Sequence, residues 1–305
     1  MEAPAWKVAS AFAAVYVIWG STYLAIRFAI ETLPPFAMAG VRFLVAGGVL
    51  YLWTRRVRGA APPGRAEWRS AVVVGGLLLL GGNGAVVWAE QFVPSGLTAL
   101  LIATVPLFMV LIDWVSGGER PTALVIVGVL WGLAGVGLLV SGEGFGGGSP
   151  AALVGGLAVL GGSLAWATGS IYSRRAPLPP SPRLGTAMQM VAGGALLLGT
   201  GVARGELAGF DAGAVTLRSA LALAYLVVFG SLVAFSCYIW LLRVVSPARV
   251  STYAYVNPVV ALFLGWALAG EPLGPGILLA AAVILSAVML INVVGRVRRR
   301  TPATE

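Results

Sequence analysis

The chain has 305 residues, of which 59% are hydrophobic and 10% are charged, and its formal net charge is +9. Soluble domains carry about 25% charged residues, so this composition predicts a polytopic membrane protein rather than a soluble enzyme. The sequence has no histidine, one cysteine (Cys237) and one lysine (Lys7), which excludes histidine-based metal sites, an internal disulfide and a Walker A motif. We therefore expect no metal, no cofactor and no engine for ATP hydrolysis.

Apolar runs of about 20 residues follow one another along the chain, the length that spans a hydrocarbon core of about 30 Å. Proline- and glycine-rich turns separate them, and the longest loop, 55–69, is too short for a folded soluble domain. The first run is longer than the apolar core of a signal peptide, so we take it as a permanent span. The ten predicted spans are residues 8–27, 36–54, 70–91, 96–116, 122–140, 152–172, 184–203, 218–241, 249–268 and 275–294.

Positive charge decides the predicted orientation, because basic loops resist translocation. If the N-terminus lies in the cytoplasm, 16 of the 20 basic residues fall in cytoplasmic segments, three fall on the other side, and Arg42 lies within a span. We therefore expect a multi-pass membrane protein with both termini in the cytoplasm. The net charge then reflects topology within a lipid bilayer, and no nucleic-acid partner is expected.

An internal repeat divides the chain into two halves. At a constant offset of 152 residues, five residues recur: Trp88 as Trp240, Pro106 as Pro258, Trp114 as Trp266, Gly118 as Gly270 and Glu119 as Glu271. Five spans per half is an odd number, so the second half begins on the opposite side of the membrane. We predict an all-α fold of ten transmembrane helices in two inverted five-helix repeats, 1–146 and 147–305. Inverted repeats favour alternating access.

These features resemble a known group of transporters. The paired five-helix halves, the stretch Trp19-Gly20-Ser21-Thr22-Tyr23 and the two proline-to-Gly-Glu copies are similar to the drug/metabolite transporter superfamily and, within it, to the bacterial EamA-type exporters. The resemblance implies a central substrate cavity lined mainly by the first, third, fourth, sixth, eighth and ninth helices. It also implies a place in the bacterial inner membrane and export of amino acids, metabolites or cationic drugs without ATP. The type most resembled is an amino-acid exporter.

Polar and aromatic side chains inside the spans are the candidates for this cavity, because lipid offers them no hydrogen-bond partner. We expect an aromatic-walled, mildly polar cavity that suits a small zwitterion or, through cation–π contact, an organic cation. For the deeply placed aromatic residues, helix packing is the alternative. The candidates are Trp19, Tyr23, Asn83, Trp88, Gln91, Trp166, Ser170, Tyr253, Tyr255 and Asn257.

Charged residues within the spans need a partner or a route to water. Glu90, near the outer end of the third span, is the candidate for proton coupling, and contact with interfacial water is the alternative. Arg42 should have a partner or extend to the surface, because an unpaired arginine costs about 2.5–3.5 kcal/mol on insertion scales. We expect Glu119 and Glu271 to anchor helix ends and loops.

Two prolines lie in the middle of corresponding spans. Pro106 and Pro258 are expected to kink their helices, because each lacks the N–H that would bond the carbonyl four residues earlier. Asn257, next to the second proline, offers a donor and an acceptor, whereas its counterpart Val105 offers neither. Such asymmetry is suited to recognition of a chiral molecule.

Glycines at close-packing spacing mark the fifth span, at Gly128, Gly132 and Gly135. They are expected to pack within the bundle or between protomers, in a monomer or weak homodimer. A carrier of sugar phosphates or nucleotide sugars would need several basic residues in its cavity, and the spans offer essentially Arg42. An intramembrane enzyme is not expected, since no metal site or nucleophile–base pair is evident. The sequence does not distinguish a carrier from a channel-like facilitator.

Overall fold

The computed structural model describes residues 4–118, 120–141, 149–245 and 253–300, and every regular element within them is helical. The first-half helices are α1 (Ala5–Ala29), α2 (Pro35–Arg56), α3 (Arg65–Gly75), η1 (Gly76–Asn83), α4 (Gly84–Ala89), α5 (Ser95–Ile102), α6 (Val105–Val115) and α7 (Ala123–Ser141). Those of the second half are α8 (Pro150–Ser173), α9 (Pro182–Ala203), η3 (Ala212–Ala214), α10 (Leu217–Tyr225), η4 (Leu226–Val233), α11 (Ala234–Val244), α13 (Tyr253–Ala269) and α14 (Pro275–Arg300).

These helices form the predicted membrane spans. Within the described residues, eight helical segments are long and apolar enough to cross a membrane, and α13 and α14 contain two shorter apolar stretches, Val256–Ala269 and Pro275–Ile291. The third span combines α3, η1 and α4, the fourth combines α5 and α6, and the eighth combines α10, η4 and α11. Proline stands at the first helical position of α2, α8 and α9, where its missing N–H costs nothing. The predicted all-α fold is confirmed.

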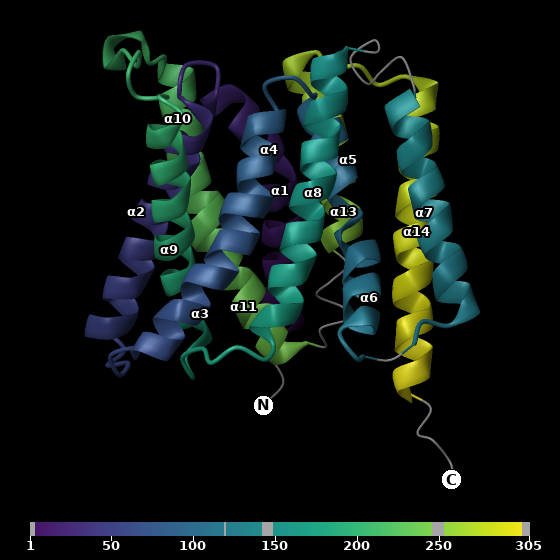
Figure 1. The fold of residues 1–305 in the computed structure, drawn as a ribbon, viewed down its shortest axis with the longest axis horizontal. Coiled ribbons are helices and arrows are strands. Elements are labelled where there is room, and N and C mark those ends of the chain that lie inside the picture. Colours follow the sequence, from purple (N-terminus) through teal and green to yellow (C-terminus); the bar gives the residue numbers. More distant parts are fainter. Residues whose placement is uncertain (1–3, 119, 142–148, 246–252, 301–305) are drawn as a thin grey trace.

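The two halves enter the bundle from opposite ends. Both chain termini lie at one face, which we call the terminal face, at the bottom of Figure 1. Helix α1 begins there, whereas α8 begins at the other face, which we call the opposite face (Figure 1). The fold is therefore built from inverted halves, as the odd number of spans per half predicts.

Helix packing follows the same inversion. Helix α1 packs on α13 and on α10 and α11, which belong to the ninth and eighth spans. Helix α8 packs on α6 and on η1 and α4, which belong to the fourth and third spans. Exchanging the two halves therefore converts the contacts of α1 into those of α8. The α2–α9, α7–α14 and α5–α13 pairs are made of corresponding spans and map onto themselves.

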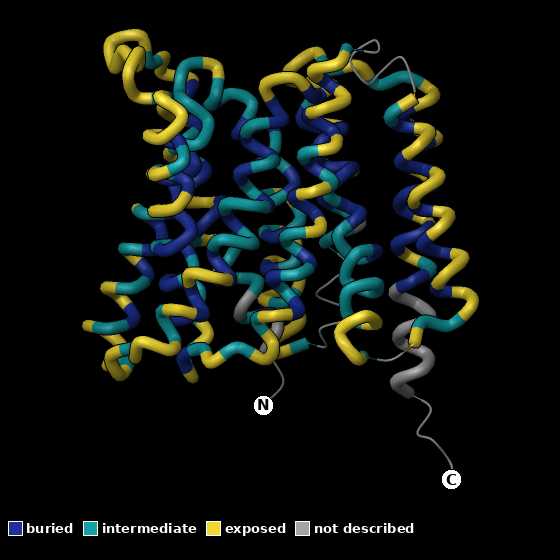
Figure 2. The backbone as a smooth tube through the Cα atoms, in the orientation of Figure 1, coloured by how far each residue is buried: buried dark blue, intermediate teal, exposed yellow. Residues whose placement is uncertain are grey.

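Glycines allow these self-corresponding pairs to pack closely. In the α2–α9 pair, a Cβ placed on Gly40 would lie 2.7 Å from the backbone nitrogen of Leu198. In the α7–α14 pair, the fifth-span glycines face α14, and a Cβ on Gly135 would lie 2.8 Å from Ile284. The predicted role of these glycines in packing within the bundle is confirmed. Figure 2 shows exposed residues along the outer rims of α7 and α14, where side chains such as Leu130 and Leu279 are apolar, as expected for helices that face lipid.

Candidate functional site

Two spans that correspond in the two halves contain π-helical turns. Within the described residues these are η1, between α3 and α4, and η4, between α10 and α11. A π-helix shifts the register of the helix and is often found at functional sites. The sequence predicts regular helices at these positions. In η1 the clustered glycines Gly76, Gly81 and Gly82 are a local signal for the π-helical turn.

Each π-helical segment is contacted by a tryptophan from the other half. The indole Nε1 of Trp19, on α1, donates a hydrogen bond of 3.1 Å to the backbone oxygen of Gly230 in η4. Trp166, on α8, lies against Gly82 in η1, where a Cβ would stand 2.7 Å from the indole carbon Cε3. The two predicted cavity tryptophans thus contact corresponding spans of the opposite half, Trp19 through a hydrogen bond and Trp166 through ring packing.

An aromatic cluster surrounds Trp19. Its ring centroid lies 5.2 Å from that of Tyr238, 5.2 Å from that of Tyr253 and 5.9 Å from that of Phe235. The rings of Tyr238 and Tyr253 are 5.8 Å apart and nearly perpendicular. The cluster therefore brings together α1, α11 and α13. Phe235 and Tyr238 are absent from the predicted cavity set, although their spacing of three residues places them on one helical face.

Glu90 is the most deeply buried charged residue among those described, with no exposed surface. Neither of its carboxylate oxygens has a hydrogen-bond partner among the described residues. Its backbone oxygen accepts a hydrogen bond from Nη1 of Arg27.

Arg42 is also buried, with 6% of its surface exposed. Its Nε donates a hydrogen bond of 2.9 Å to Oγ of Ser231 in η4, and its guanidinium lies 4.7 Å from the ring centroid of Phe43. A Cβ on Gly230 would stand 3.2 Å from the Nη2 atom of Arg42, so a glycine at this position makes room for the guanidinium. The prediction that Arg42 has a partner is confirmed.

The two proline-containing spans pack against each other but differ in their backbones. Helix α5 ends at Ile102 and α6 begins at Val105, so the fourth span is broken just before Pro106. Helix α13 continues through Pro258. Asn257, next to this proline, is 7% exposed, and its Oδ1 has no partner among the described residues. A Cβ on Gly20 of α1 would stand 3.2 Å from the backbone oxygen of Asn257.

The other predicted residues of the third and sixth spans do not gather at one point. Gln91 is exposed, and its Nε2 donates a hydrogen bond to the backbone oxygen of Trp88. Trp88 packs against Phe92, and Ser170 donates to the backbone oxygen of Trp166. Gln91 is exposed although its neighbour Glu90 is buried, because the helix ends at Ala89 and the chain turns there.

Two further predicted residues are half-buried. Asn83 ends η1, and Tyr23 packs against the buried cluster that includes Val86 and Val87 of α4. The side chain of Tyr255 and the whole of Glu119 lie outside the described residues.

Two helices are capped by acidic side chains that lie far away in the sequence but in direct contact in the fold. The carboxylate of Glu271 accepts hydrogen bonds from the backbone nitrogens of Ser95, at 2.7 Å, and Gly96, at 3.0 Å, at the start of α5. This confirms its predicted anchoring role. Glu206 binds the start of α2 in the same manner, through the backbone nitrogens of Phe36 and Ala37. An anion at a helix N-terminus satisfies free N–H groups and complements the helix dipole.

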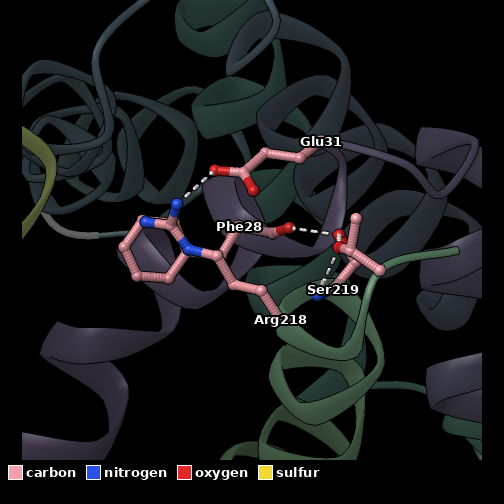
Figure 3. A network of polar contacts seen from close by, with 5 residues as sticks. Phe28, Glu31, Arg218 and Ser219 are labelled. Carbon is pink, nitrogen blue, oxygen red and sulfur yellow. Dashed lines mark hydrogen bonds and ion pairs between the residues drawn. The ribbon is translucent and has the colours of Figure 1, made fainter.

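A group of contacts joins α1 to α10 at the opposite face (Figure 3). Nη1 of Arg218 lies 3.2 Å from Oε1 of Glu31, and the Arg218 guanidinium lies 3.6 Å from the ring centroid of Phe28. Oγ of Ser219 donates a hydrogen bond of 2.8 Å to the backbone oxygen of Phe28. We call Phe28, Glu31, Arg218 and Ser219 the opposite-face clamp. Sequence reasoning missed it because its two parts are about 190 residues apart and carry the ordinary features of helix ends.

Surface grooves adjoin α1 near both faces of the described part of the chain. One lies beside the clamp, between α1, α10 and α13, where Oγ of Ser21 and the hydroxyl of Tyr225 are 2.6 Å apart. The other lies near the terminal face, between α1 and α11, and includes Cys237 and Trp240. The predicted cavity residues line neither groove.

Comparisons with known proteins agree with this architecture. The model of the EamA-like transporter family matches residues 6–141 and 153–293. The uncharacterized inner membrane transporter YedA of Escherichia coli K12 is 42% identical over 92% of this chain and 88% of its own length. The probable amino-acid metabolite efflux pump of Salmonella typhimurium is 27% identical, covering 93% of this chain and 94% of its own. A solved crystal structure aligns with a TM-score of 0.64 at 23% identity, over 96% of this chain and 99% of that one, which supports the fold.

The family model matches both halves, and together these matches cover most of the chain. The inverted halves, the apolar spans and the buried polar residues between them are the parts expected of a membrane carrier. The chain therefore belongs to the EamA-like transporter family and is a membrane transporter.

Proposed function

We propose that this transporter exports small metabolites, with amino acids as the leading class, from the cytoplasm across the inner membrane by alternating access. The observation that carries the proposal is the exchange of equivalent contacts between the halves, with Trp19 on η4 and Trp166 on η1. Such inverted symmetry allows each half to adopt the conformation of the other, which moves access from one face to the other. The name of the Salmonella relative, an amino-acid metabolite efflux pump, supports the substrate class.

The contacts at the two faces support a conformation closed at the opposite face. There the clamp holds α1 and α10 together through an ion pair, a cation–π contact and a hydrogen bond. At the terminal face, the end of α8 has longer contacts: Arg174 lies 3.8 Å from Asp113, and Nη1 of Arg175 lies 3.4 Å from the backbone oxygen of Ser116. With both termini in the cytoplasm, as the basic loops predict, the terminal face is the loading side.

Glu90 is the proposed proton carrier. A buried carboxylate without a hydrogen-bond partner is costly when ionised, so binding and release of a proton during the cycle would change the stability of the closed state. The units that move are the proposed repeats, 1–146 and 147–305, in a protein that works as a monomer or weak homodimer.

The test is uptake into inverted membrane vesicles, screened over radiolabelled amino acids and quaternary ammonium ions, with and without an imposed pH gradient. Amino-acid uptake that rises with the gradient supports the proposal, and Glu90→Gln should abolish that rise. Asp211→Asn is the matched control, because Asp211 is an exposed acid in a loop. Unchanged pH dependence in Glu90→Gln would remove Glu90 from the coupling role, and absence of uptake for every solute would contradict export.

Export of organic cations is the second candidate function. The rings of Trp19, Tyr238 and Tyr253 form a cluster that could hold a cation through cation–π contact, and Glu90 would add negative charge. Uptake of quaternary ammonium ions without uptake of amino acids would favour this candidate. A carrier of sugar phosphates is less well supported, because an unpartnered buried carboxylate disfavours a strongly anionic solute.

A further inference from the structure

We propose that the groove beside the opposite-face clamp binds a phospholipid with an ethanolamine headgroup, phosphatidylethanolamine, from the membrane leaflet at that face. One acyl chain lies in the groove between α1, α10 and α13, and the headgroup meets the ion pair of Arg218 with Glu31. None of the predicted substrate-cavity residues lines this groove. The inference is therefore independent of the proposed export function.

The groove has the volume of a small-molecule site and the depth of one leaflet. Its volume is about 520 Å³, and such sites usually occupy about 300–1,000 Å³. On α1 its lining runs from Val17 to Phe28, which at about 1.5 Å per residue is roughly 16 Å along the helix. One leaflet supplies half of the hydrocarbon core, or roughly 15 Å. The groove therefore extends from the clamp to about the middle of the membrane.

The walls of the groove are mostly apolar, and the groove opens on the side that faces lipid. Its lining includes Val17, Leu221 and Leu268, one from each helix, with exposed fractions of 56%, 60% and 61%. An unfilled hollow beside these side chains would lose dispersion contacts on one side. A flexible hydrocarbon chain restores those contacts and requires no hydrogen bond from the walls.

The polar side chains inside the groove bind each other. Oγ of Ser21 donates a hydrogen bond of 2.9 Å to the backbone oxygen of Ile18, and it lies 2.6 Å from the hydroxyl of Tyr225. The Tyr225 hydroxyl is therefore the donor in the second contact, and both hydroxyl protons are used. The carboxylate of an amino acid would find no free hydroxyl donor at this depth, whereas an alkyl chain needs none.

The mouth of the groove carries one positive and one negative charge where the lipid headgroups lie. Nη1 of Arg218 lies 3.2 Å from Oε1 of Glu31, and the two side chains are 52% and 39% exposed (Figure 3). A guanidinium fork matches phosphate oxygens, and a carboxylate accepts hydrogen bonds from an ammonium group. Phosphoethanolamine carries both a phosphate and an ammonium group. Phosphoglycerol has no ammonium group, and phosphocholine has no N–H donor.

The experiment measures phospholipid binding to the purified full-length transporter in detergent by native mass spectrometry. The three probes carry the same palmitoyl and oleoyl chains and differ in headgroup: phosphatidylethanolamine, phosphatidylglycerol and phosphatidylcholine. The wild type should retain one phosphatidylethanolamine about three- to fivefold more than either other lipid, the modest effect of an exposed charge pair. The same lipid should raise the unfolding temperature, because a ligand of the folded state stabilises it. Equal retention of the three lipids would overturn the headgroup assignment.

Variants that fill the groove test the place of the acyl chain. Leu221→Trp on α10 and Leu268→Trp on α13 should each abolish lipid retention and the rise in unfolding temperature. Leu217→Trp is the matched control, because Leu217 is an exposed leucine of α10 that does not line the groove. A cooperative unfolding transition without added lipid shows that a variant is folded. Undiminished lipid retention in either folded groove variant would overturn the proposal.

Variants of the ion pair test the place of the headgroup. Arg218→Gln should lower the retention of all three lipids, because the unpaired Glu31 carboxylate repels phosphate. Glu31→Gln should raise phosphatidylglycerol to at least the level of phosphatidylethanolamine, because Arg218 is then free to bind an anion. Arg204→Gln changes an exposed arginine outside the groove and should leave the order of the lipids unchanged. An unchanged order in Glu31→Gln would overturn the headgroup assignment. A lipid-free dimer that dissociates in Leu221→Trp would assign the groove to a second copy and overturn the proposal.

Discussion

The two halves of the transporter share their helix packing but not their chemistry. The contacts of α1 with the ninth and eighth spans have inverted counterparts in those of α8 with the fourth and third spans. The buried charged residues in the described part of the chain, Arg42 and Glu90, both belong to the first half. The stretch Val45-Ala46-Gly47-Gly48 recurs as Val191-Ala192-Gly193-Gly194, which places buried Met188 at the position of Arg42. The offset of 152 places Leu242 at the position of Glu90. In the proposed mechanism, the repeat supplies a symmetric scaffold for motion, and the positions where the repeat is broken are the candidates for substrate recognition.

The proline-containing spans show the same contrast in the backbone. The fourth span is interrupted between Ile102 and Val105, whereas α13 is continuous through Pro258. Asn257 stands where the first half has Val105. One of the two central helices therefore contributes a broken backbone and the other contributes an amide side chain.

The largest expected effect comes from locking one face. In a Cys237→Ser background, we combine Glu31→Cys with Arg218→Cys and form the disulfide across the opposite-face clamp by oxidation. If the halves must separate there, oxidation should abolish transport completely and a reducing agent should restore it. The single-cysteine variants are controls and should be insensitive to oxidant. Undiminished transport by the cross-linked protein would show that the clamp does not open during the cycle.

Close packing of the corresponding spans α2 and α9 should matter next most. Gly40→Ala is expected to destabilise the protein by about 1–3 kcal/mol, because the new methyl group would overlap the backbone at Leu198. Gly48→Ala on the same helix is the matched control, since a Cβ there meets nothing within 4 Å. The unfolding temperatures of the two variants in detergent measure this difference in stability. Equal unfolding temperatures for the two variants would contradict the described contact.

Replacing Asn257 by its counterpart residue tests the asymmetry directly. Asn257→Val should lower transport about tenfold, the equivalent of roughly 1.4 kcal/mol, if the amide binds substrate. Its thermal stability should rise or stay unchanged, because Oδ1 has no partner in the described structure. The reciprocal Val105→Asn should not raise transport. A loss of stability with normal transport would instead make Asn257 a structural residue.

The smallest expected effect distinguishes the two equivalent tryptophans. Trp19→Phe removes the hydrogen bond to Gly230 and should cost about 1 kcal/mol of stability. Trp166→Phe keeps ring packing against Gly82 and should cost less, because the Trp166 ring contact described is one of packing. The stabilities of the two variants are compared by unfolding them with increasing concentrations of a denaturing detergent. A larger loss in Trp166→Phe would mean that the sixth span depends on its indole nitrogen.

Much of the fold follows from the sequence, because span length and repeated residues are local or periodic signals. They predict the ten spans, the inversion and the anchoring by Glu271. The π-helical turns, the clamp and the separation of Gln91 from Glu90 do not follow. A π-helical turn depends on contacts made by other helices, and the clamp joins residues that look like ordinary interfacial charges. Side chains within a span can be assigned to a face only if the helix stays regular.

Counterflow in reconstituted proteoliposomes tests the central claim, alternating access between inverted halves, most directly. Vesicles are preloaded with unlabelled phenylalanine or leucine and diluted into a trace of the same labelled amino acid. A carrier that exposes one site to each face in turn should give a transient accumulation of label above equilibrium, and cross-linking of the clamp should eliminate it. Label that only equilibrates, at the same rate in preloaded and empty vesicles, would contradict the account and indicate a channel.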